Sequence, residues 1–552
     1  MPSFANQSVN VHQFAMVPRA DIPRSSFDMQ SAHKTTFDAG YLVPVYVDEV
    51  LPGDTFNLKM TAFARMSTPL YPVMDNMYLD SHFFFVPNRL IWDNWPKFMG
   101  EQANPGDSTS YLVPTSNSPA GGYPVNSLQD YMGLPTVGQV TAGQIVEHNT
   151  LPLRAYNLIY NEWFRDQNLI NSVTVDRGDG PDITTNYTLL RRGKRHDYFT
   201  SALPWPNKGG VNVTLPLGTS ANIGVKAGAS PYSFVNANGY LGNNISGVFT
   251  SNGTNNLIGG AIATATGIAP LTVTQTVVNQ GVLAGNLYAD LSTATSATIN
   301  QIRQSFAIQR LLERDARGGT RYAEIIRAHF GVVSPDARLQ RPEYLGGGTS
   351  PIVINPIAQT SGTGATGQTT PLGNLAAMAT TIARNHGFTQ SFTEHGIIIG
   401  LVSVRADYSY QQGLRRMWSR STRNDFYFPA FAYLGEQAIL NKEIYSTGVN
   451  ATDDAVFGYQ ERWAEYRYHP SHITGLFRST SSGTLDGWHL GQRFTSIPAL
   501  NQTFIEENPP LSRILAVGAA ANGKQFIFDS FFNVRASRCM PLYSVPGLMD
   551  HF

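Results

Sequence analysis

The chain contains a single cysteine, Cys539, among its 552 residues. One thiol cannot form an intramolecular disulfide or make up a cysteine-based zinc site, so both are excluded. Charged residues are also scarce, at 14% against the roughly 25% that is typical of soluble proteins. The 39 basic and 39 acidic side chains cancel, so the molecule as a whole does not attract phosphate, and any basic surface must be local.

Long apolar runs are missing too. No segment approaches the roughly 18 consecutive apolar residues that a membrane-spanning helix needs. The longest candidate, residues 396–404, has the length of a strand. The first residues lack the basic and apolar regions of a secretory signal peptide. We therefore expect no membrane span, and synthesis in the cytoplasm without export by the common route.

Motifs for catalysis and cofactor binding are equally scarce. Glycines at positions 362, 364 and 367 match the dinucleotide pattern, but no acid stands about 20 residues further on. The histidine pairs His469 with His472 and His386 with His395 have no third ligand at metal-binding spacing. A nucleophile elbow and a Walker lysine motif are both absent. The sequence predicts no enzyme activity, no cofactor and no metal site.

Three acids, Asp176, Asp179 and Asp182, crowd one glycine-rich turn. Calcium prefers such oxygen-rich loops, but the spacing does not fit the EF-hand pattern. The segment is predicted to be a solvated turn.

Segments rich in β-branched and aromatic residues occur near both ends of the chain. Residues 41–50 and 55–66 are predicted to form two strands around a Pro52-Gly53-Asp54 turn. Further strands are predicted at residues 82–86, 396–404, 511–517 and 525–540. Helical periodicity is confined to residues 152–165, with Thr150 available as a cap, and to residues 298–312 and 321–329. This spacing favours an antiparallel sandwich whose loops have grown large.

The domain organisation is predicted from composition. Residues 1–30 carry prolines and little periodicity, which indicates an extended N-terminal arm, and residues 31–552 are expected to form one domain with long insertions. Residues 207–289 contain only two charged side chains, Lys208 and Lys226. A flexible linker has such a composition, but β-compatible pieces at 211–217, 247–250 and 271–278 favour an ordered or semi-ordered insertion. Residues 346–373 form a second, shorter loop of similar character.

Two basic clusters are interleaved with aromatic residues. The first contains Arg405, Arg415, Arg416, Arg420 and Arg423, together with Tyr408, Tyr410 and Trp418. The second contains Arg191, Arg192, Lys194, Arg195 and His196, ahead of Tyr198 and Phe199. Single-stranded nucleic acid needs positive charge for its phosphates and aromatic faces for its bases. Arginines are equally suited to ion pairs inside the protein or between subunits, and the sequence leaves both interpretations open.

Several long strings of low degeneracy are familiar from one protein family. They are residues 22–25 (IPRS), 34–44 (KTTFDAGYLVP), 48–60 (DEVLPGDTFNLKM), 84–92 (FFVPNRLIW), 459–472 (YQERWAEYRYHPSH) and 541–552 (PLYSVPGLMDHF). Together they resemble the major capsid protein of gokushoviruses, small single-stranded DNA bacteriophages of the Microviridae. The similarity runs along nearly the whole chain and is weakest over residues 207–289.

The resemblance implies a mainly β fold, the eight-stranded antiparallel viral jelly roll with large inserted loops and a few short helices. It implies a homo-oligomer: pentamers that build a sixty-copy T=1 icosahedral shell around a circular single-stranded DNA genome. Residues 207–289 match the insertion that forms three-fold protrusions and contributes to host attachment. The expected location is the virion, after synthesis in the bacterial host cytoplasm. The expected partners are a small basic DNA-packaging protein, a scaffolding protein during assembly, a pilot protein and a bacterial surface receptor.

Our first hypothesis is therefore a structural major capsid protein without enzymatic activity. The expected DNA contacts, on the inner face of the shell, are Arg415, Arg416, Trp418, Arg420 and Arg423. Arg191, Arg192, Lys194 and Arg195 form a second candidate nucleic-acid contact. The alternative is a jelly roll that binds or cleaves glycans, which needs an exposed aromatic groove or paired carboxylates. The sequence shows no convincing carboxylate pair.

Overall fold

A computed structural model describes residues 23–210, 213, 222–225, 287–290, 298–361, 373–516 and 523–543. The chain divides into two compact units, one of Met1–Val211 with Arg310–Phe552 and one of Asn212–Gln309. The first unit contains two large sheets. In the second unit, β7 (Asn222–Val225) pairs antiparallel with β8 (Leu287–Asp290).

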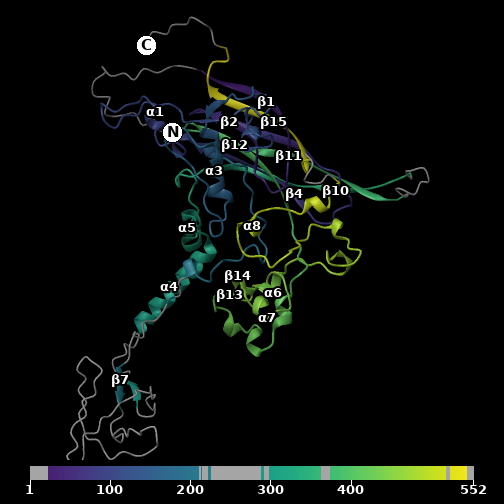
Figure 1. The fold of residues 1–552 in the computed structure, drawn as a ribbon. Coiled ribbons are helices and arrows are strands. Elements are labelled where there is room, and N and C mark those ends of the chain that lie inside the picture. The colour runs from purple at the N-terminus through teal and green to yellow at the C-terminus, as the bar shows by residue number, and fades with distance from the viewer. Residues whose placement is uncertain are drawn as a thin grey trace, which may run out of the picture. The chain divides into compact units, whose positions relative to one another are not determined.

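Nine strands make up the two large sheets, and every pair of neighbours is antiparallel. The five-stranded sheet has the order β1-β15-β3-β11-β10 and the four-stranded sheet the order β2-β12-β4-β9. Figure 1 shows the first strand, β1, beside the last, β15. The strands are β1 (Arg24–Phe37), β2 (Val43–Val50), β3 (Thr55–Met66), β4 (Met77–Pro87), β9 (Glu343–Pro351), β10 (Val353–Ala358), β11 (Leu375–Ser391), β12 (Gly396–Ala406) and β15 (Phe526–Cys539).

The order of these strands is that of a jelly roll. Strands β1, β2, β3 and β4 alternate between the two sheets, and β11, β12 and β15 alternate in the same way. Strand β9 joins the four-stranded sheet, so each sheet receives four strands of two interlocked Greek keys. Strand β10 is an additional edge strand that pairs with β11. The predicted fold class, an antiparallel eight-stranded jelly roll with large loops and few short helices, is confirmed.

Smaller elements lie in the connections. Two further antiparallel pairs are β5 (Thr115–Asn117) with β6 (Glu147–Asn149), and β13 (Glu436–Leu440) with β14 (Val456–Glu461). The helices are α1 (Trp95–Phe98), α2 (Leu128–Tyr131), α3 (Leu151–Ile159), α4 (Ile299–Gly318), α5 (Tyr322–Phe330), α6 (Asn441–Ile444), α7 (Asn450–Asp453) and α8 (Gln502–Ile505). Within the described residues, no helix is long and apolar enough to cross a membrane.

The core between the sheets follows from alternation along the strands. In β3 the even-numbered residues from 56 to 66 are buried and the odd-numbered residues from 57 to 65 are exposed, because successive side chains of a strand point to opposite faces. Aromatic rings from both sheets meet in this layer. The ring centroids of Phe83 in β4 and Phe388 in β11, for example, lie 5.6 Å apart. The outer face of the five-stranded sheet therefore remains exposed.

The four-stranded sheet is instead covered on both sides. Strand β12 is a continuous apolar run that is buried along almost its whole length. Its even-numbered members, such as Ile398 and Val402, belong to the core between the sheets. Its odd-numbered members, such as Ile397 and Ile399, belong to a second core that includes the apolar face of α3. A continuous apolar strand is what such two-sided burial requires.

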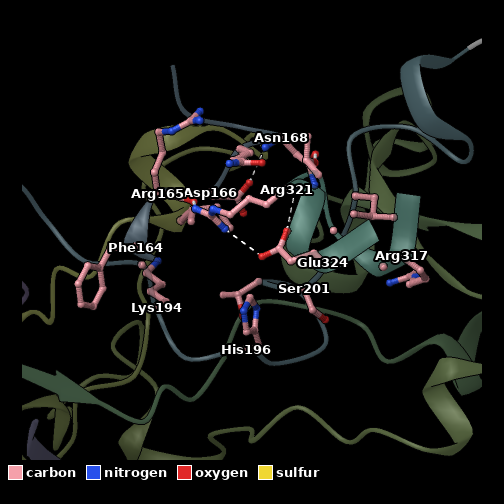
Figure 2. Close-up of a pocket in the computed structure, with 18 of the residues that line it drawn as sticks. Phe164, Arg165, Asp166, Asn168, Lys194, His196, Ser201, Arg317, Arg321 and Glu324 are labelled. Atoms are coloured by element: carbon pink, nitrogen blue, oxygen red, sulfur yellow. Dashed lines mark hydrogen bonds and ion pairs between the residues drawn. The ribbon is translucent and has the colours of Figure 1, made fainter. Parts of the chain in front are cut away.

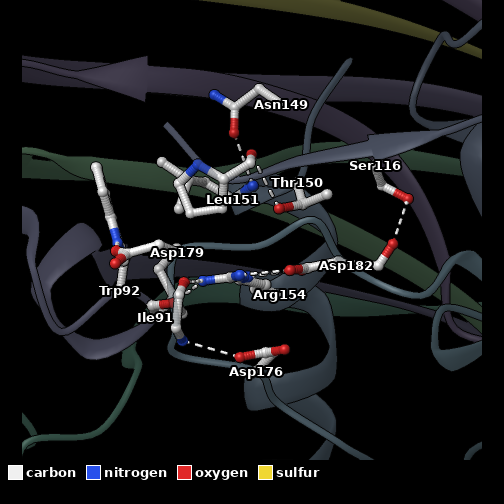
Figure 3. Close-up of polar contacts among 12 residues, drawn as sticks. Ile91, Trp92, Ser116, Asn149, Thr150, Leu151, Arg154, Asp176, Asp179 and Asp182 are labelled. Atoms are coloured by element: carbon white, nitrogen blue, oxygen red, sulfur yellow. Dashed lines mark hydrogen bonds and ion pairs between the residues drawn. The ribbon is translucent and has the colours of Figure 1, made fainter. Parts of the chain in front are cut away.

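Arg154 of α3 ties together the loops over this second core (Figure 3). The side chain is completely buried, and its guanidinium binds Asp182 through Nε, 2.7 Å from the carboxylate. Its Nη1 donates to the carbonyl oxygens of Ile91 at 3.0 Å and of Gly178 at 2.9 Å. Burial opposes ionisation of Asp182, but hydrogen bonds from Arg154 and Tyr187 outweigh it and lower the pKa of this carboxyl.

Most predicted elements are confirmed, with small shifts of their ends. The strand predicted at residues 55–66 is β3, and the turn before it holds Gly53 at a φ of 89°, a backbone conformation that favours glycine. The carboxylate of Asp54 accepts a hydrogen bond from the Leu51 amide at 3.0 Å and closes this turn. The two strands joined by the turn, β2 and β3, belong to opposite sheets.

Four expectations about local structure were wrong. Residues 24–30, assigned to an extended arm, are the first part of β1. Residues 511–516 of the strand expected at 511–517 do not form a strand: 511–513 are a single 3-10 turn. They follow Pro509 and Pro510, and proline cannot donate to a sheet ladder. The loop expected at 346–373 holds the end of β9 and all of β10. Thr150 precedes α3 but does not cap it, because its hydroxyl donates to the Pro114 carbonyl.

Some predicted features lie outside the described residues. These are residues 1–22 of the expected arm, the β-compatible pieces at 247–250 and 271–278, and all but residue 213 of the piece at 211–217.

Candidate nucleic-acid interface

The first basic cluster divides into paired and exposed arginines. Arg416 lies in a 3-10 turn after β12 and binds Glu443 at 3.0 Å. Arg420 binds Glu465 at 3.0 Å and lies over the ring of Tyr466, 4.3 Å from its centroid. Both guanidinium groups are therefore engaged inside the protein, as arginines in internal ion pairs are.

Three other members of this cluster face solvent. Arg415 is exposed and donates to the Nδ1 atom of His469 at 2.8 Å. Arg423 is exposed and lies 5.3 Å from the ring centroid of Phe428, with no ion pair among the described residues. Trp418 is 68% exposed. This combination of free cations and an open aromatic face suits a single strand of nucleic acid.

Most cations of the second cluster bind residues of other segments of the protein and do not form an exposed basic surface. Arg191 donates to the Glu507 carbonyl at 2.8 Å and stacks on Tyr41, 4.1 Å from the ring centroid. Arg192 binds Asp80 at 2.7 Å, and Arg405 of the first cluster binds the same carboxylate at 2.8 Å. Burial and the charge of Arg405 lower the pKa of Arg192 to about 10.

The remaining two cations of this cluster differ from each other. Lys194 is buried between aromatic rings, 4.5 Å from the centroid of Phe504 and 5.3 Å from that of Tyr408. Burial lowers its pKa to about 8. Arg195 binds Asp407 at 2.8 Å at a half-exposed position. Asp80 thus joins Arg192 to Arg405, while Arg415, Trp418 and Arg423 lie on a separate loop.

A further basic surface lies on the outer face of the five-stranded sheet, which we call the open face. Its acids are already paired, Asp529 with Lys34 and Asp28 with Arg535, each at 3.4 Å. Three more exposed cations have no hydrogen bond or ion pair within the described residues. They are Lys59 and Arg65 of β3 and Arg384 of β11.

Aromatic and apolar side chains stand between these cations on the open face. Phe63 of β3 is 45% exposed and Phe531 of β15 is 44% exposed. Phe63 pairs across the sheet with Ile382 on one side and with Asp529 on the other. Positive charge around open rings on a sheet provides phosphate neutralisation together with base stacking.

Comparison with known proteins places the whole chain in one family. The family model described as "Capsid protein (F protein)" matches residues 15–548. The chain belongs to this capsid protein family. It is 49% identical over 550 residues to capsid protein VP1 of Bdellovibrio phage phiMH2K, covering 98% of this chain and 99% of that one. Capsid protein VP1 of Chlamydia phage 1 is 45% identical and that of Spiroplasma virus 4 is 36% identical, each with 98% coverage of both chains.

The chain is therefore a structural component of a phage virion. The resemblance to gokushovirus capsid proteins is confirmed, because these relatives are capsid proteins of phages of that type. A capsid protein acts by assembling in many copies, and this role is structural, not enzymatic. For a subunit of this kind, exposed loops and sheet faces are the surfaces that remain for contacts with neighbouring copies.

Sequence reasoning did not find the open face of this capsid protein. Lys59 and Arg65 are six positions apart with no other charged residue between them, and Arg384 lies far along the chain, so the three do not form a charge cluster in the sequence. The available signal was the alternation in β3, which places Lys59, Phe63 and Arg65 on one face of a strand. The neighbouring strands that complete the surface follow only from the sheet order.

Proposed function

We propose that copies of this chain form pentamers and then a sixty-copy T=1 icosahedral shell that encloses a circular single-stranded DNA genome, with residues 207–289 contributing to host attachment. Family membership over residues 15–548 supports a shell of many copies. The jelly roll with long loops offers the large surfaces that permanent assemblies bury, often more than about 2,000 Å².

The composition of the open face is the observation that best supports the proposed enclosure of DNA. It holds unpaired cations and exposed aromatic rings on one rigid sheet, whereas the opposite sheet is covered by α3 and its neighbouring loops. We propose that the open face contacts the DNA and faces the interior of the shell. The exposed loop with Arg415, Trp418 and Arg423 provides a second contact in this proposal.

The chain has no net charge, which supports the proposal that basic partners help to neutralise the genome. A packaged genome carries one negative charge per nucleotide, and the local cations of the open face are few by comparison. We propose that a small basic DNA-packaging protein supplies the remaining neutralisation. A scaffolding protein during assembly, a pilot protein and a bacterial surface receptor complete the proposed set of partners.

Removing the exposed cations is expected to reduce packaged DNA without preventing assembly. One variant carries Lys59→Gln, Arg65→Gln and Arg384→Gln on the open face, and another carries Arg415→Gln, Trp418→Ala and Arg423→Gln on the loop. Each lost phosphate contact is expected to lower the salt slope of oligonucleotide binding by about 1. The measurement is nucleic-acid content per intact particle, by absorbance and quantitative PCR, together with this salt slope.

The paired arginines provide the contrast. Arg416→Gln and Arg420→Gln break ion pairs with Glu443 and Glu465, so these variants are expected to unfold more easily while DNA content per assembled particle stays normal. Normal DNA content in both exposed-residue variants would refute the assignment of the DNA contacts.

Shortening the insertion is expected to abolish host attachment and to leave the shell intact. Val225 and Leu287 are antiparallel partners in the β7–β8 ladder, so an Asn-Gly turn is suited to join them directly in place of residues 226–286. The residues removed belong to the second compact unit, whereas both large sheets belong to the first. Particle yield by electron microscopy and adsorption to host cells are the measurements. Loss of all folded protein, or unchanged adsorption, would contradict the proposal.

A further inference from the structure

A cavity of about 1230 Å³ lies beside the four-stranded sheet, entirely within the first compact unit. Its walls come from the segment after α3, from residues 192–203, from the junction of α4 with α5, and from the ends of β4 and β12. Figure 2 shows Arg165, Lys194, His196 and Arg321 around this space. Ligand pockets usually measure about 300–1,000 Å³, so the cavity has room for a small molecule.

Lys194 is one of the cations in this wall. The side chain is only 8% exposed, yet its ammonium makes no hydrogen bond or ion pair with any described residue. Its ammonium lies near the rings of Phe504 and Tyr408 and interacts with the charges of Glu507 and Asp197. A lysine ammonium carries three donors, and those of Lys194 remain available on the cavity wall. Such a group is matched by an anion that enters the cavity.

Arg165 is a second cation of this wall without an ion pair among the described residues. Arg165 donates to the Ile170 carbonyl at 2.8 Å but has no acidic partner among the described residues, and its Nε is buried without an acceptor. Burial and the neighbouring charge of Arg321 lower the pKa of Arg165. Arg192 and Arg405 share one carboxylate, that of Asp80. Positive charge is therefore in excess along this wall.

Four acids line the cavity, fewer than its seven arginine and lysine side chains. Asp166 accepts from backbone amides of its own loop, and Asp197 accepts from the hydroxyl of Tyr410 at 2.6 Å. Glu324 binds Arg321 at 3.0 Å and also accepts from its backbone amide. Glu461 pairs with Arg467.

A base also needs an aromatic surface to stack on, and the same cavity provides one. Phe164 lines it and lies 5.5 Å from His82 and 5.7 Å from Phe84 between ring centroids. The guanidinium of Arg192 lies 5.5 Å from the centroid of Phe164. A ring held by such neighbours is a rigid platform for a planar base.

We propose that this cavity is a nucleotide site, in which Lys194 and Arg165 hold a phosphate and Phe164 stacks with a base. The phosphate and base belong either to a free nucleotide or to one residue of a single strand. Binding of one residue of a single strand rests on the proposed enclosure of single-stranded DNA. Binding of a free nucleotide does not. The site is distinct from the open face, which consists of other residues on the other sheet.

Binding of dAMP to the purified full-length protein tests the proposal by isothermal titration calorimetry. We expect saturable binding of dAMP, with none for deoxyadenosine, which lacks the phosphate. Lys194→Met is expected to weaken dAMP binding about tenfold or more, the loss of one charge-assisted contact. Phe164→Leu is expected to weaken dAMP but not inorganic phosphate. Lys59→Met on the open face and Phe330→Leu on α5 are the matched controls and are expected to bind normally.

The Lys194 variant is expected to fold, because it removes a charge that burial disfavours. The pH dependence of dAMP binding provides a second readout. The ionisable groups that face Lys194 are the acids Glu507 and Asp197 and the phenol of Tyr408. Its pKa of about 8 predicts that dAMP binds about tenfold more weakly at pH 9 than at pH 7, since the nucleotide phosphate is already fully ionised there. Lys194→Met is expected to lose this dependence.

An oligonucleotide of deoxyadenosines separates the two sources and the two sites. Weaker oligonucleotide binding in Lys194→Met would indicate that a single strand enters the cavity, and unchanged oligonucleotide binding with weaker dAMP binding would indicate a free nucleotide. Loss of oligonucleotide binding with normal dAMP binding in the open-face triple variant would support two separate sites, whatever the DNA content of particles. Absence of dAMP binding, equal binding of deoxyadenosine, or full dAMP affinity in a folded Lys194→Met variant would overturn the nucleotide site. Equal affinities for phosphate and dAMP would overturn it as well, because the base would then contribute nothing.

Discussion

Replacing Arg154 with methionine is expected to destabilise the protein by about 3–5 kcal/mol, the usual cost of removing one partner from a buried ion pair. Asp182 is almost fully buried and depends on Arg154 for two of its hydrogen bonds. The carbonyl groups of Ile91 and Gly178 lose their donor in the same step. Denaturant unfolding of the unassembled protein measures the change, and poor recovery of soluble protein at 37 °C is the expected practical result.

A double variant distinguishes the lost charge balance from lost packing. Arg154→Met with Asp182→Leu removes both charges, and replacing a whole buried pair by apolar groups is often close to neutral. We therefore expect the double variant to be more stable than Arg154→Met alone. Arg338→Met, at an exposed arginine without side-chain partners in the described residues, should stay within about 0.5 kcal/mol of the native protein. A single variant as stable as this control would contradict the proposed role of Arg154.

The strands were predictable where the pattern along the chain is itself the physical cause of the fold. Alternation in β3 and the continuous apolar run in β12 correspond directly to one-sided and two-sided burial. The prediction of a solvated turn is confirmed for Asp176 and Asp179, which are exposed, but it is wrong for Asp182. Asp182 is buried there because Arg154, on a different element, neutralises it, and no local pattern reveals that partner.

The candidate site was predictable only in part, for a similar reason. Arg416 and Arg423 are seven positions apart and equivalent in composition, yet one binds Glu443 and the other is exposed without an ion pair in the described part of the chain. Which of the two is available for DNA depends on acids that lie in later elements. Local sequence identifies basic clusters, whereas their availability is decided by tertiary contacts.

Glu507 is a buried carboxyl group close to Lys194 and Arg405 of the two basic clusters. The side chain is completely buried. Its Oε1 accepts from the hydroxyl of Tyr408 at 2.7 Å and from the amide of Ala406 at 3.1 Å, while Oε2 has no partner within the described residues. Burial raises the pKa of Glu507 to about 7, against the lowering effect of these hydrogen bonds and of the charges on Lys194 and Arg405.

This raised pKa predicts a loss of stability between pH 4.5 and 7. The folded protein binds a proton at Glu507 that the unfolded chain has already released, so the free energy of unfolding falls as pH rises through this window. A shift from 4.5 to about 7 corresponds to about 3 kcal/mol. Glu507→Gln cannot titrate, and its stability relative to the native protein is therefore expected to increase by about that amount from pH 4.5 to 8.

Comparing the free energies of unfolding of Glu507→Gln and the native protein at each pH separates the contribution of Glu507 from those of the other titrating groups. His82, whose pKa burial lowers to about 3, and Glu443, whose pKa burial raises, titrate in both proteins, so their contributions cancel in the difference. Glu101→Gln, at an exposed position, is expected to give a flat difference and serves as the control. A flat difference for Glu507→Gln as well would mean that Glu507 stays ionised in the folded state, with Lys194 and Arg405 outweighing its burial.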